Sequence, residues 1–487
     1  MLSLHVSAFE RLAWAPFRWS CSSYRSSADG VLLIAADLCS TWTAPQFVLP
    51  LPNLVCKHQS FCCKTLTGLA PTTGRATLVM KLLSCSLTAI WLAAFQVEAQ
   101  NVSAFPPFKG DAFQRYNITS AGINATFIPY GARLTNLWVS DRNGTAQDVV
   151  MGYDTGEQYV RDTAGPHSYM GGVVGRYANR IKNGTFEVDG QTFHVPKNSA
   201  NTSTLHGGTV GYDQRNWTVV QHEPDSITFA FYDQAFEGFP GDVINYATYS
   251  VSSDPVPRGT SRLVSIPLSQ KTPIMLSNHV YWNLGAFVNQ AAQHVYDNTL
   301  HMPYSSRYVQ VETSQVPNGT IGTVSGTFLD FTTPKLIGDQ IFKGPKNSCG
   351  VNCTGYNNAF IIDRPRYSSP EATDLVVLTM SSPETGIKMD VRTNQQNLEI
   401  FSCNWFNGSI KAKADQQYSA GAGAMNSTYD SHGCIVVEPQ GWVDAINEPQ
   451  WGQEKYQVYG VDTLPAVNFA TYEFSAFAKE DNTKDEL

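Results

Sequence analysis

The sequence places a few side chains that can transfer protons among apolar or aromatic neighbours. Glu438 follows the apolar run 435–437, where partial burial would raise its pKa towards the range useful to a general base. His279 stands close to Tyr281 and Trp282, aromatic residues that suit stacking against a sugar ring. Taken singly, each has an ordinary alternative: a strand-end ion pair for the glutamate, and a hydrogen-bonded core position for the histidine.

His206 and Arg180 are weaker candidates of the same kind. His206 precedes Gly207 and Gly208, where the backbone could approach a ligand closely, although a turn histidine would look the same. Arg180 could hold a ring or hydroxyl oxygen, or form a structural salt bridge. Together with Glu438, these residues indicate acid–base chemistry on a small hydroxyl-bearing ligand.

Short strands are the elements that must position these residues. Turn signals such as Asn143-Gly144 and Asn407-Gly408 separate the apolar runs, and 186–193 has the pattern of a tight hairpin. Helical periodicity is scarce, and neither a GxGxxG nor a Walker loop occurs. The pattern predicts an all-β fold, a large antiparallel β-sandwich. The clearest strand-like runs are 126–129, 226–231, 375–380, 387–391 and 435–438.

Composition agrees with a β-rich globular protein. Of 487 residues, 12% are aromatic and only 15% are charged, below the usual quarter. The net charge of −8 argues against nucleic acid as a partner, since that needs a basic surface. No segment after residue 100 is apolar enough to predict stable membrane insertion.

The N-terminal part differs from the rest. Met80-Lys81, an apolar stretch of 14 residues and the small residue Ala99 predict a signal peptide at 80–99. Residues 1–79 are then a non-native, unstructured extension, and 100–487 form a single domain. The alternative is a cytosolic protein with an internal hydrophobic helix. The chain ends in Lys-Asp-Glu-Leu at 484–487, the retrieval address of the endoplasmic reticulum.

Eleven N-x-S/T sequons follow Ala99 and predict a glycosylated surface in the secretory pathway. We expect the lumen of the endoplasmic reticulum if the C-terminal address functions, and an extracellular location otherwise. The candidate glycosylation sites are Asn101, Asn117, Asn124, Asn143, Asn183, Asn201, Asn216, Asn318, Asn352, Asn407 and Asn426.

Four cysteines remain after residue 100. Their order favours disulfides Cys349–Cys353 and Cys403–Cys434 in an oxidising compartment. Free thiols are the main alternative. A zinc site is the least favoured, because the spacing does not match a zinc finger.

Five stretches together resemble the aldose 1-epimerase family, also called galactose mutarotases. They read GRYANRIKNGTFEVDGQTFHV, LHGGTVGYDQRNW, EGFPGDV, SNHVYWNL and VVEPQGWVDAINEP, and the resemblance spans about residues 104–475. It implies a galactose mutarotase-like supersandwich and an isomerase that interconverts the α and β anomers of free aldohexoses such as glucose or galactose. It implies no cofactor and no metal.

The resemblance also implies roles for the residues already singled out. Glu438 would take the proton of the anomeric hydroxyl as the base, and His279 would protonate the ring oxygen from the opposite side of the sugar. His206 would hydrogen-bond near the ring oxygen as a second acid. Asn179 and Arg180 would hold sugar oxygens.

Two positions depart from the family pattern. Asn357 stands where the family usually has an aspartate that binds sugar hydroxyls, so one charge of the substrate site is missing. Glu399 stands where glutamine is more common. Its carboxylate would either raise the pKa of Glu438 or attract Arg180.

Three other functions use the same residues. An epimerase of sugar phosphates would need a phosphate clamp of extra arginine or lysine near the site, for which Arg176 and Arg180 are the candidates close to the motifs. A carbohydrate-binding protein would keep the pocket without turnover. A glycoside hydrolase would need two carboxylates flanking a glycosidic bond, and Glu399 with Glu438 is the pair to consider.

Overall fold

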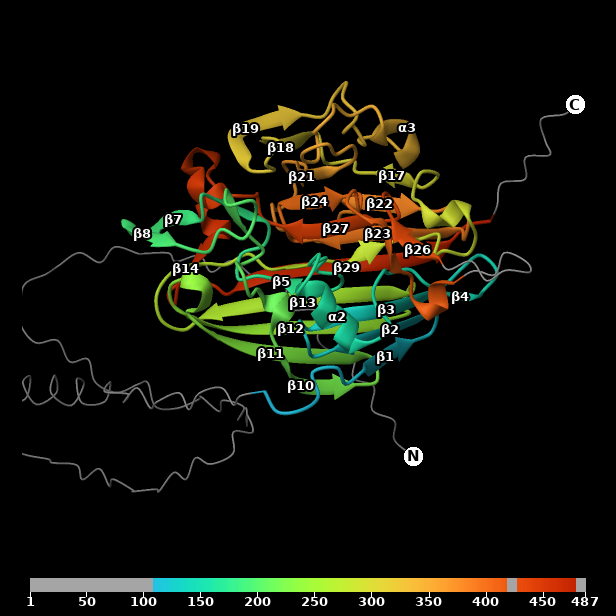
Figure 1. Ribbon diagram of the computed structural model, residues 1–487, viewed down its shortest axis with the longest axis horizontal. Coiled ribbons are helices and arrows are strands. Elements are labelled where there is room, and N and C mark those ends of the chain that lie inside the picture. Colours follow the sequence, from blue (N-terminus) through green and yellow to red (C-terminus); the bar gives the residue numbers. More distant parts are fainter. Residues whose placement is uncertain (1–107, 418–426, 479–487) are drawn as a thin grey trace, which may run out of the picture. The chain divides into compact units, whose positions relative to one another are not determined.

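The computed structural model describes residues 108–417 and 427–478, which all belong to one compact unit of layered antiparallel sheets (Figure 1). The predicted extension, signal peptide and C-terminal address, together with Asn101 and Asn426, lie outside the described residues. Strands dominate and helices are few, which confirms the predicted all-β class. No helix among residues 108–417 and 427–478 is long and apolar enough to cross a bilayer.

The largest sheet has nine strands, with the long strand β29 at its centre (Figure 1). Every paired neighbour in it is antiparallel. Its strands, in spatial order, are β10 (Thr218–Glu223), β11 (Ser226–Gln234), β12 (Asp242–Ser252), β13 (Arg258–Pro267), β29 (Ala466–Ala476), β23 (Ile387–Thr393), β22 (Leu378–Ser381), β17 (Thr299–His301) and β20 (Lys335–Leu336).

A six-stranded and a four-stranded sheet complete the main layers. The six-stranded sheet runs β16 (Tyr281–Trp282), β27 (Ile435–Gln440), β24 (Asn397–Phe401), β21 (Asn357–Ile361), β18 (Arg307–Val311) and β19 (Pro317–Thr323). The four-stranded sheet runs β1 (Tyr116–Ser120), β2 (Ile123–Ile128), β3 (Arg133–Ser140) and β4 (Ala146–Asp148).

Two-stranded pairs and short helices fill the connections. The pairs are β14 (Thr272–Pro273) with β28 (Val458–Tyr459), β15 (Ser277–Asn278) with β5 (Val173–Val174), β25 (Asn407–Lys411) with β26 (Thr428–Asp430), β6 (Arg180–Lys182) with β9 (Ser203–Leu205), and β7 (Thr185–Val188) with β8 (Gln191–His194). The α-helices are α2 (Gly156–Thr163) and α3 (Ile337–Ile341).

Strand alternation decides which side chains of the six-stranded sheet form the core. Leu398 and Ile400 of β24 and Val437 of β27 lie in a core cluster that also contains residues of β22, β23 and β29. Glu399 and Glu438 occupy the intervening positions. Because successive side chains of a strand point to opposite faces, the two carboxylates face away from that core.

The strand-like runs singled out from the sequence coincide largely with strands of the structure. The runs 226–231, 387–391 and 435–438 lie within β11, β23 and β27, and the hairpin at 186–193 is β7–β8. Its turn has positive φ at both Asp189 and Gly190, as a two-residue hairpin requires. The run 375–380 enters its strand only at Leu378. Helix α2 was missed, because two turns are too short for a sustained period; a capping box of Thr155 and Gln158 marks its start.

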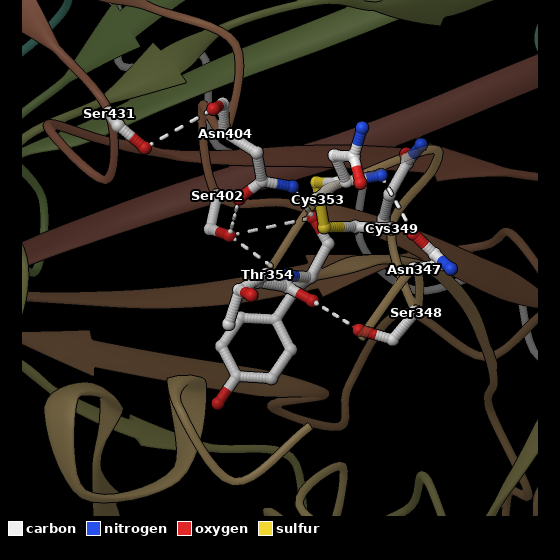
Figure 2. Close-up of a disulfide and its surroundings, with 12 residues drawn as sticks. Asn347, Ser348, Cys349, Cys353, Thr354, Ser402, Asn404 and Ser431 are labelled. Atoms are coloured by element: carbon white, nitrogen blue, oxygen red, sulfur yellow. Dashed lines mark hydrogen bonds between the residues drawn. A yellow bond between two sulfur atoms is a disulfide. The ribbon is translucent and has the colours of Figure 1, made fainter. Parts of the chain in front are cut away.

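All four cysteines after residue 100 are paired in the structure. The bonds are Cys349–Cys353 (Figure 2) and Cys403–Cys434, the pairing that local order favours. Of the nine described sequon asparagines, eight are exposed and only Asn124 of β2 is partly buried.

Candidate active site

A cavity of about 530 Å³ lies on the outward face of the six-stranded sheet. Strands β21, β24 and β27 form its floor and contribute Asn357, Glu399 and Glu438. Its walls come from loops and from the ends of α2 and of short strands, in the segments 163–169, 179–180, 205–206, 279–281 and 405–406. Every catalytic or substrate-binding residue predicted from the sequence therefore lines this one cavity.

His279 and Glu438 are in direct contact on one side of the cavity. His279 Nε2 lies 3.4 Å from Glu438 Oε1, and both side chains are buried. The histidine backbone is fixed by Gly171 and Gly172: its N–H donates to the Gly172 carbonyl at 2.9 Å, and its carbonyl accepts from the Gly171 N–H at 2.8 Å. The two groups are thus neighbours rather than lying on opposite sides of a ligand.

Burial shifts the pKa of each partner towards its uncharged form. Burial lowers the pKa of His279 to about 3. Burial, aided by the nearby Glu399 carboxylate, raises the pKa of Glu438 well above its usual value. Since a low-dielectric site disfavours isolated charge, the contact pair holds one proton, and both shifts favour its residence on Glu438 with a neutral His279 beside it.

His206 has its proton position fixed by the backbone. The ring Nδ1 of His206 accepts a hydrogen bond from the Asn179 backbone N–H at 3.1 Å. The backbone N–H of His206 donates to the Asn179 carbonyl at 2.9 Å. Burial lowers the pKa of His206 well below its usual range, so the ring is neutral. A neutral ring that accepts at Nδ1 carries its proton on Nε2, which leaves a hydrogen-bond donor for the cavity.

Glycine makes this arrangement of His206 possible. A side chain at Gly207, where φ is +89°, would meet the Gly175 carbonyl oxygen at 2.0 Å. The chain can therefore pass this close to Gly175 only without a Cβ atom. His206 itself takes a left-handed φ of 50°.

Glu399 belongs to a buried polar group with Asn179 and Arg180. Asn179 Nδ2 donates to Glu399 Oε2 at 3.1 Å, and Arg180 Nη1 donates to Asn179 Oδ1 at 3.3 Å. Burial raises the pKa of Glu399 to about 8, against the opposing effects of Arg180 and the Asn179 hydrogen bond. Both predicted effects of Glu399 therefore operate, because it raises the pKa of Glu438 and also interacts with Arg180.

Tyr169 and His167 are two of the aromatic cavity residues that were missed from the sequence. The Tyr169 ring lies nearly parallel to His279 at 5.6 Å and stacks on His167 at 3.8 Å. His167 Nε2 contacts Asp213 Oδ2 at 2.9 Å, and Arg133 supports the same carboxylate at 3.8 Å. His167 and Tyr169 both have left-handed φ angles, which no sequence pattern predicts. The only available signal was Asp213, inside the stretch LHGGTVGYDQRNW.

Arg176 lies outside the cavity. Its guanidinium is paired with Asp233 at 2.7 Å and donates to the carbonyls of Pro240 and Gly241. Among the described residues, Arg180 is therefore the only lysine or arginine that lines the cavity. A phosphate group in this cavity would have Arg180 as its cationic partner, and Arg180 also interacts with the carboxylates of Glu399 and Glu438.

One donor atom each from His206, His279 and Glu438 lies within 4.8 Å of the others, a spacing that a metal ion could use. The Asn179 N–H opposes this use. This N–H donates to Nδ1 of His206, so the ring proton lies on Nε2. A protonated Nε2 has no lone pair with which to bind a metal ion. The donor set thus suits proton transfer better than metal binding.

Comparison with known proteins agrees with this geometry. A family model for aldose 1-epimerase matches residues 114–459. The chain is 50% identical over 383 residues to a probable aldose 1-epimerase of Arthroderma benhamiae, covering 74% of this chain and 86% of that protein. It is 29% identical over 348 residues to the galactose mutarotase of Rattus norvegicus, covering 71% and 90% respectively.

A solved structure shares the fold. The GalM/aldose epimerase homologue from C. elegans matches with a TM-score of 0.62 at 25% identity, over 75% of this chain and 100% of that chain. The family model spans well over half of the sequence, and half of the positions aligned with the Arthroderma benhamiae protein are identical. The chain is therefore an isomerase of the aldose 1-epimerase family.

Proposed function

We propose that the protein interconverts the α and β anomers of free aldohexoses such as glucose or galactose. The observation that carries this proposal is the 3.4 Å contact between His279 and Glu438 in a cavity large enough for a sugar. The anomeric hydroxyl and the ring oxygen are bonded to the same carbon, C1. A base and an acid that serve these two oxygens must therefore be close neighbours, as these residues are.

The reaction needs only the proton that the pair shares. In the form of the pair in which that proton lies on His279, Glu438 removes the proton of the C1 hydroxyl while His279 gives its own proton to the ring oxygen. The bond from C1 to the ring oxygen breaks, its electron pair stays on that oxygen, and C1 becomes a carbonyl. After rotation about C1–C2, the two proton transfers reverse and close the ring on the other face. The pair holds one proton at each stage, so acid and base exchange roles.

Neighbouring residues assist this step. The Nε2–H of His206 is a fixed donor for the ring oxygen, where negative charge develops. Arg180 and Asn179 supply donors for hydroxyl oxygens. Burial raises the pKa of the Tyr169 hydroxyl, which keeps it protonated as a further donor, and its ring covers one side of the cavity.

The alternatives fit less well. A sugar phosphate would place two negative charges beside Glu399 and Glu438 with only Arg180 to balance them. Glu399 accepts a hydrogen bond from Asn179 and lies close to Arg180, so it is not a free second carboxylate of the kind a glycoside hydrolase requires. A purely sugar-binding protein has no need of a buried pair that shares a proton.

The test is anomer exchange by polarimetry or NMR with freshly dissolved α-glucose and α-galactose. We expect the protein to accelerate equilibration, and Glu438→Gln to reduce kcat by about 10²–10⁴-fold. The circular dichroism spectrum and thermal midpoint of the variant should stay close to those of the parent. If the folded parent protein accelerates neither sugar, the proposal fails.

We further propose that the mature chain passes through the secretory pathway. The exposure of eight sequon asparagines and the pairing of all four cysteines after residue 100 support this. The C-terminal address at 484–487 favours the lumen of the endoplasmic reticulum over an extracellular location.

A further inference from the structure

A second cavity, of about 550 Å³, lies at one end of the six-stranded sheet. Arg307 begins β18 here, Ile361 ends β21, and Trp442 follows the end of β27. Asn357, which lines the catalytic cavity around Glu438, lies at the opposite end of β21. Among the described residues, none lines both cavities. The second cavity is therefore a separate candidate site.

Apolar packing closes the second cavity towards the catalytic one. Ala359 lies opposite Glu399 in the pair β21–β24, and it packs in one cluster with Ile361 and Trp442. Cross-strand partners point to the same face, so this cluster occupies the strip of sheet between the two cavities. A ligand in the second cavity is thus kept apart from the proposed catalytic pair.

The second cavity is cationic, in a protein whose net charge is −8. Among the described residues that line it, four are lysine or arginine and only Asp363 is acidic. The catalytic cavity has the reverse balance, with one such cation and two carboxylates. Positive charge gathered in one cavity of an acidic protein favours an anionic ligand there. The four cations are Arg307, Arg364, Arg366 and Lys455.

Two of these cations are already held within the fold. Arg307 pairs with Asp363. The Arg364 guanidinium donates to the Ala372 carbonyl at 3.1 Å and to the Gln395 carbonyl at 2.8 Å. Because backbone carbonyls rather than a carboxylate hold Arg364, its positive charge is fixed at the cavity wall before a ligand arrives, which lowers the entropy cost of binding.

Arg366 and Lys455 are the cations that remain available to a ligand. Both are exposed, and no ion pair among the described residues includes either of them. Glu371 and Asp374 lie near Arg364, but they do not line the second cavity. Arg366 and Lys455 can therefore pair with an anion that enters it.

Two polar atoms of the same cavity are buried without a hydrogen bond. Trp442 is only 8% exposed, and its indole N–H has no acceptor among the described residues. Gln453 Oε1 likewise has no donor there. Buried polar groups in folded proteins are nearly always paired, so these two atoms indicate a place for a ligand. Its atoms would be an acceptor for Trp442 and a hydroxyl or amino donor for Gln453.

We propose that the second cavity binds a small organic phosphate, in which a phosphate monoester is joined to a hydroxylated ring. A phosphate monoester carries nearly two negative charges at neutral pH, so it suits Arg366 and Lys455 together with the fixed charge of Arg364. Trp442 and Tyr456 supply aromatic surface for the ring. A volume of about 550 Å³ is in the range of cavities that hold such ligands. Sugar phosphates and nucleoside monophosphates share this chemistry.

The test is isothermal titration calorimetry of the full chain with glucose 1-phosphate, AMP and inorganic phosphate. We expect saturable binding of at least one organic phosphate, tighter than that of inorganic phosphate. Arg366→Ala combined with Lys455→Ala should weaken this binding about tenfold or more, because two charge-assisted contacts are lost. The matched control combines Lys343→Ala with Lys411→Ala, since both lysines are exposed and line neither cavity.

Arg180→Ala decides which cavity the phosphate occupies. Arg180 is the one lysine or arginine among the described residues that lines the catalytic cavity, so this variant should leave phosphate binding unchanged. A preference for glucose 1-phosphate identifies a sugar-phosphate site and a preference for AMP a nucleotide site, and either result supports the proposal.

Three results would overturn the proposal. The first is that neither organic phosphate binds, and the second is that inorganic phosphate binds as tightly as both. The third is that binding is lost in Arg180→Ala but kept when Arg366 and Lys455 are both replaced by alanine. Because calorimetry measures binding without turnover, the outcome does not depend on the proposed anomer exchange.

Discussion

Glu399 lies directly opposite Glu438 in the antiparallel pair β24–β27, and both carboxylates enter the same cavity. Cross-strand neighbours on one face have Cβ atoms only about 5 Å apart. Two charges at this distance repel, and Arg180 lies close enough to affect both. The proton affinity of the proposed base therefore depends on a residue that need not touch the reacting carbon.

The first prediction concerns the alkaline limit of activity. Glu399 ionises near pH 8, and its charge raises the pKa of Glu438. Glu399→Gln removes that charge, so the His279–Glu438 pair should lose its shared proton at lower pH. We expect the alkaline limb of kcat/KM to move down by about one pH unit. The control is Glu312→Gln, because Glu312 is exposed and does not line the cavity. If the alkaline limb of kcat/KM does not move in Glu399→Gln, the charge of Glu399 does not affect the pKa of Glu438.

Glu399 should also impose a pH dependence on stability. An unfolded glutamate titrates near 4.5, but Glu399 in the folded protein titrates near 8. Between these values the folded state binds more protons than the unfolded state, so stability must fall as pH rises. Thermal unfolding between pH 5 and pH 8 should show a declining midpoint. The decline should be shallower in Glu399→Gln, and equal slopes would show that Glu399 is not buried in solution.

The two histidines should differ in importance. Asparagine tolerates the left-handed backbone of His206, so His206→Asn tests the side chain rather than the turn. We expect a loss of about tenfold in kcat, because one donor to the ring oxygen is removed. His279→Asn removes the partner of Glu438 and should cost about 10²–10⁴-fold. A larger loss in His206→Asn than in His279→Asn would mean that His206, rather than His279, transfers the proton.

Arg176 and Arg180 should separate stability from activity. Arg176→Ala leaves Asp233 buried without its partner, and should lower the free energy of unfolding by about 3–5 kcal/mol. Arg180→Ala should instead raise KM and raise the pKa of Glu438, since the nearby positive charge is lost. Urea titration and the anomer-exchange assay provide the two measurements. A normal KM in Arg180→Ala would exclude it from sugar binding.

Sequon occupancy provides a test of the secretory proposal. In protein from a eukaryotic secretory host, the eight exposed sequons are accessible, whereas Asn124 is partly buried in β2. We expect occupancy at several exposed sites and none at Asn124. Peptide mass spectrometry after enzymatic deglycosylation in heavy-oxygen water identifies each site. Unmodified asparagine at every site would contradict passage through the pathway.

Local patterns in the sequence predicted the all-β class and a carboxylate, Glu438, within a buried strand that lines the cavity. The apolar run 435–437 identified both a strand and Glu438 as the carboxylate that follows it. The pairing of Glu399 with Glu438 could not be predicted, because register depends on contacts between segments far apart in sequence. Nor could the direction of Arg176, which is set by its remote partner Asp233.

Backbone conformation accounts for the remaining omissions. Tyr169 and His167 enter the cavity from left-handed positions in a loop without periodicity. Trp405 reaches the mouth through a turn fixed by side-chain hydrogen bonds and disulfides. Such features arise from tertiary structure, so single-sequence patterns do not reveal them.

The floor of the cavity and the wall of the core are opposite faces of the same two strands, β24 and β27. Their amide groups are hydrogen-bonded on both sides within the six-stranded sheet. Hydrogen exchange of these amides should therefore require global unfolding rather than a local fluctuation. The carboxylate of Glu438, the proposed base, therefore keeps its position for as long as the domain remains folded, and any adjustment to a ligand must occur in the segments around the strands.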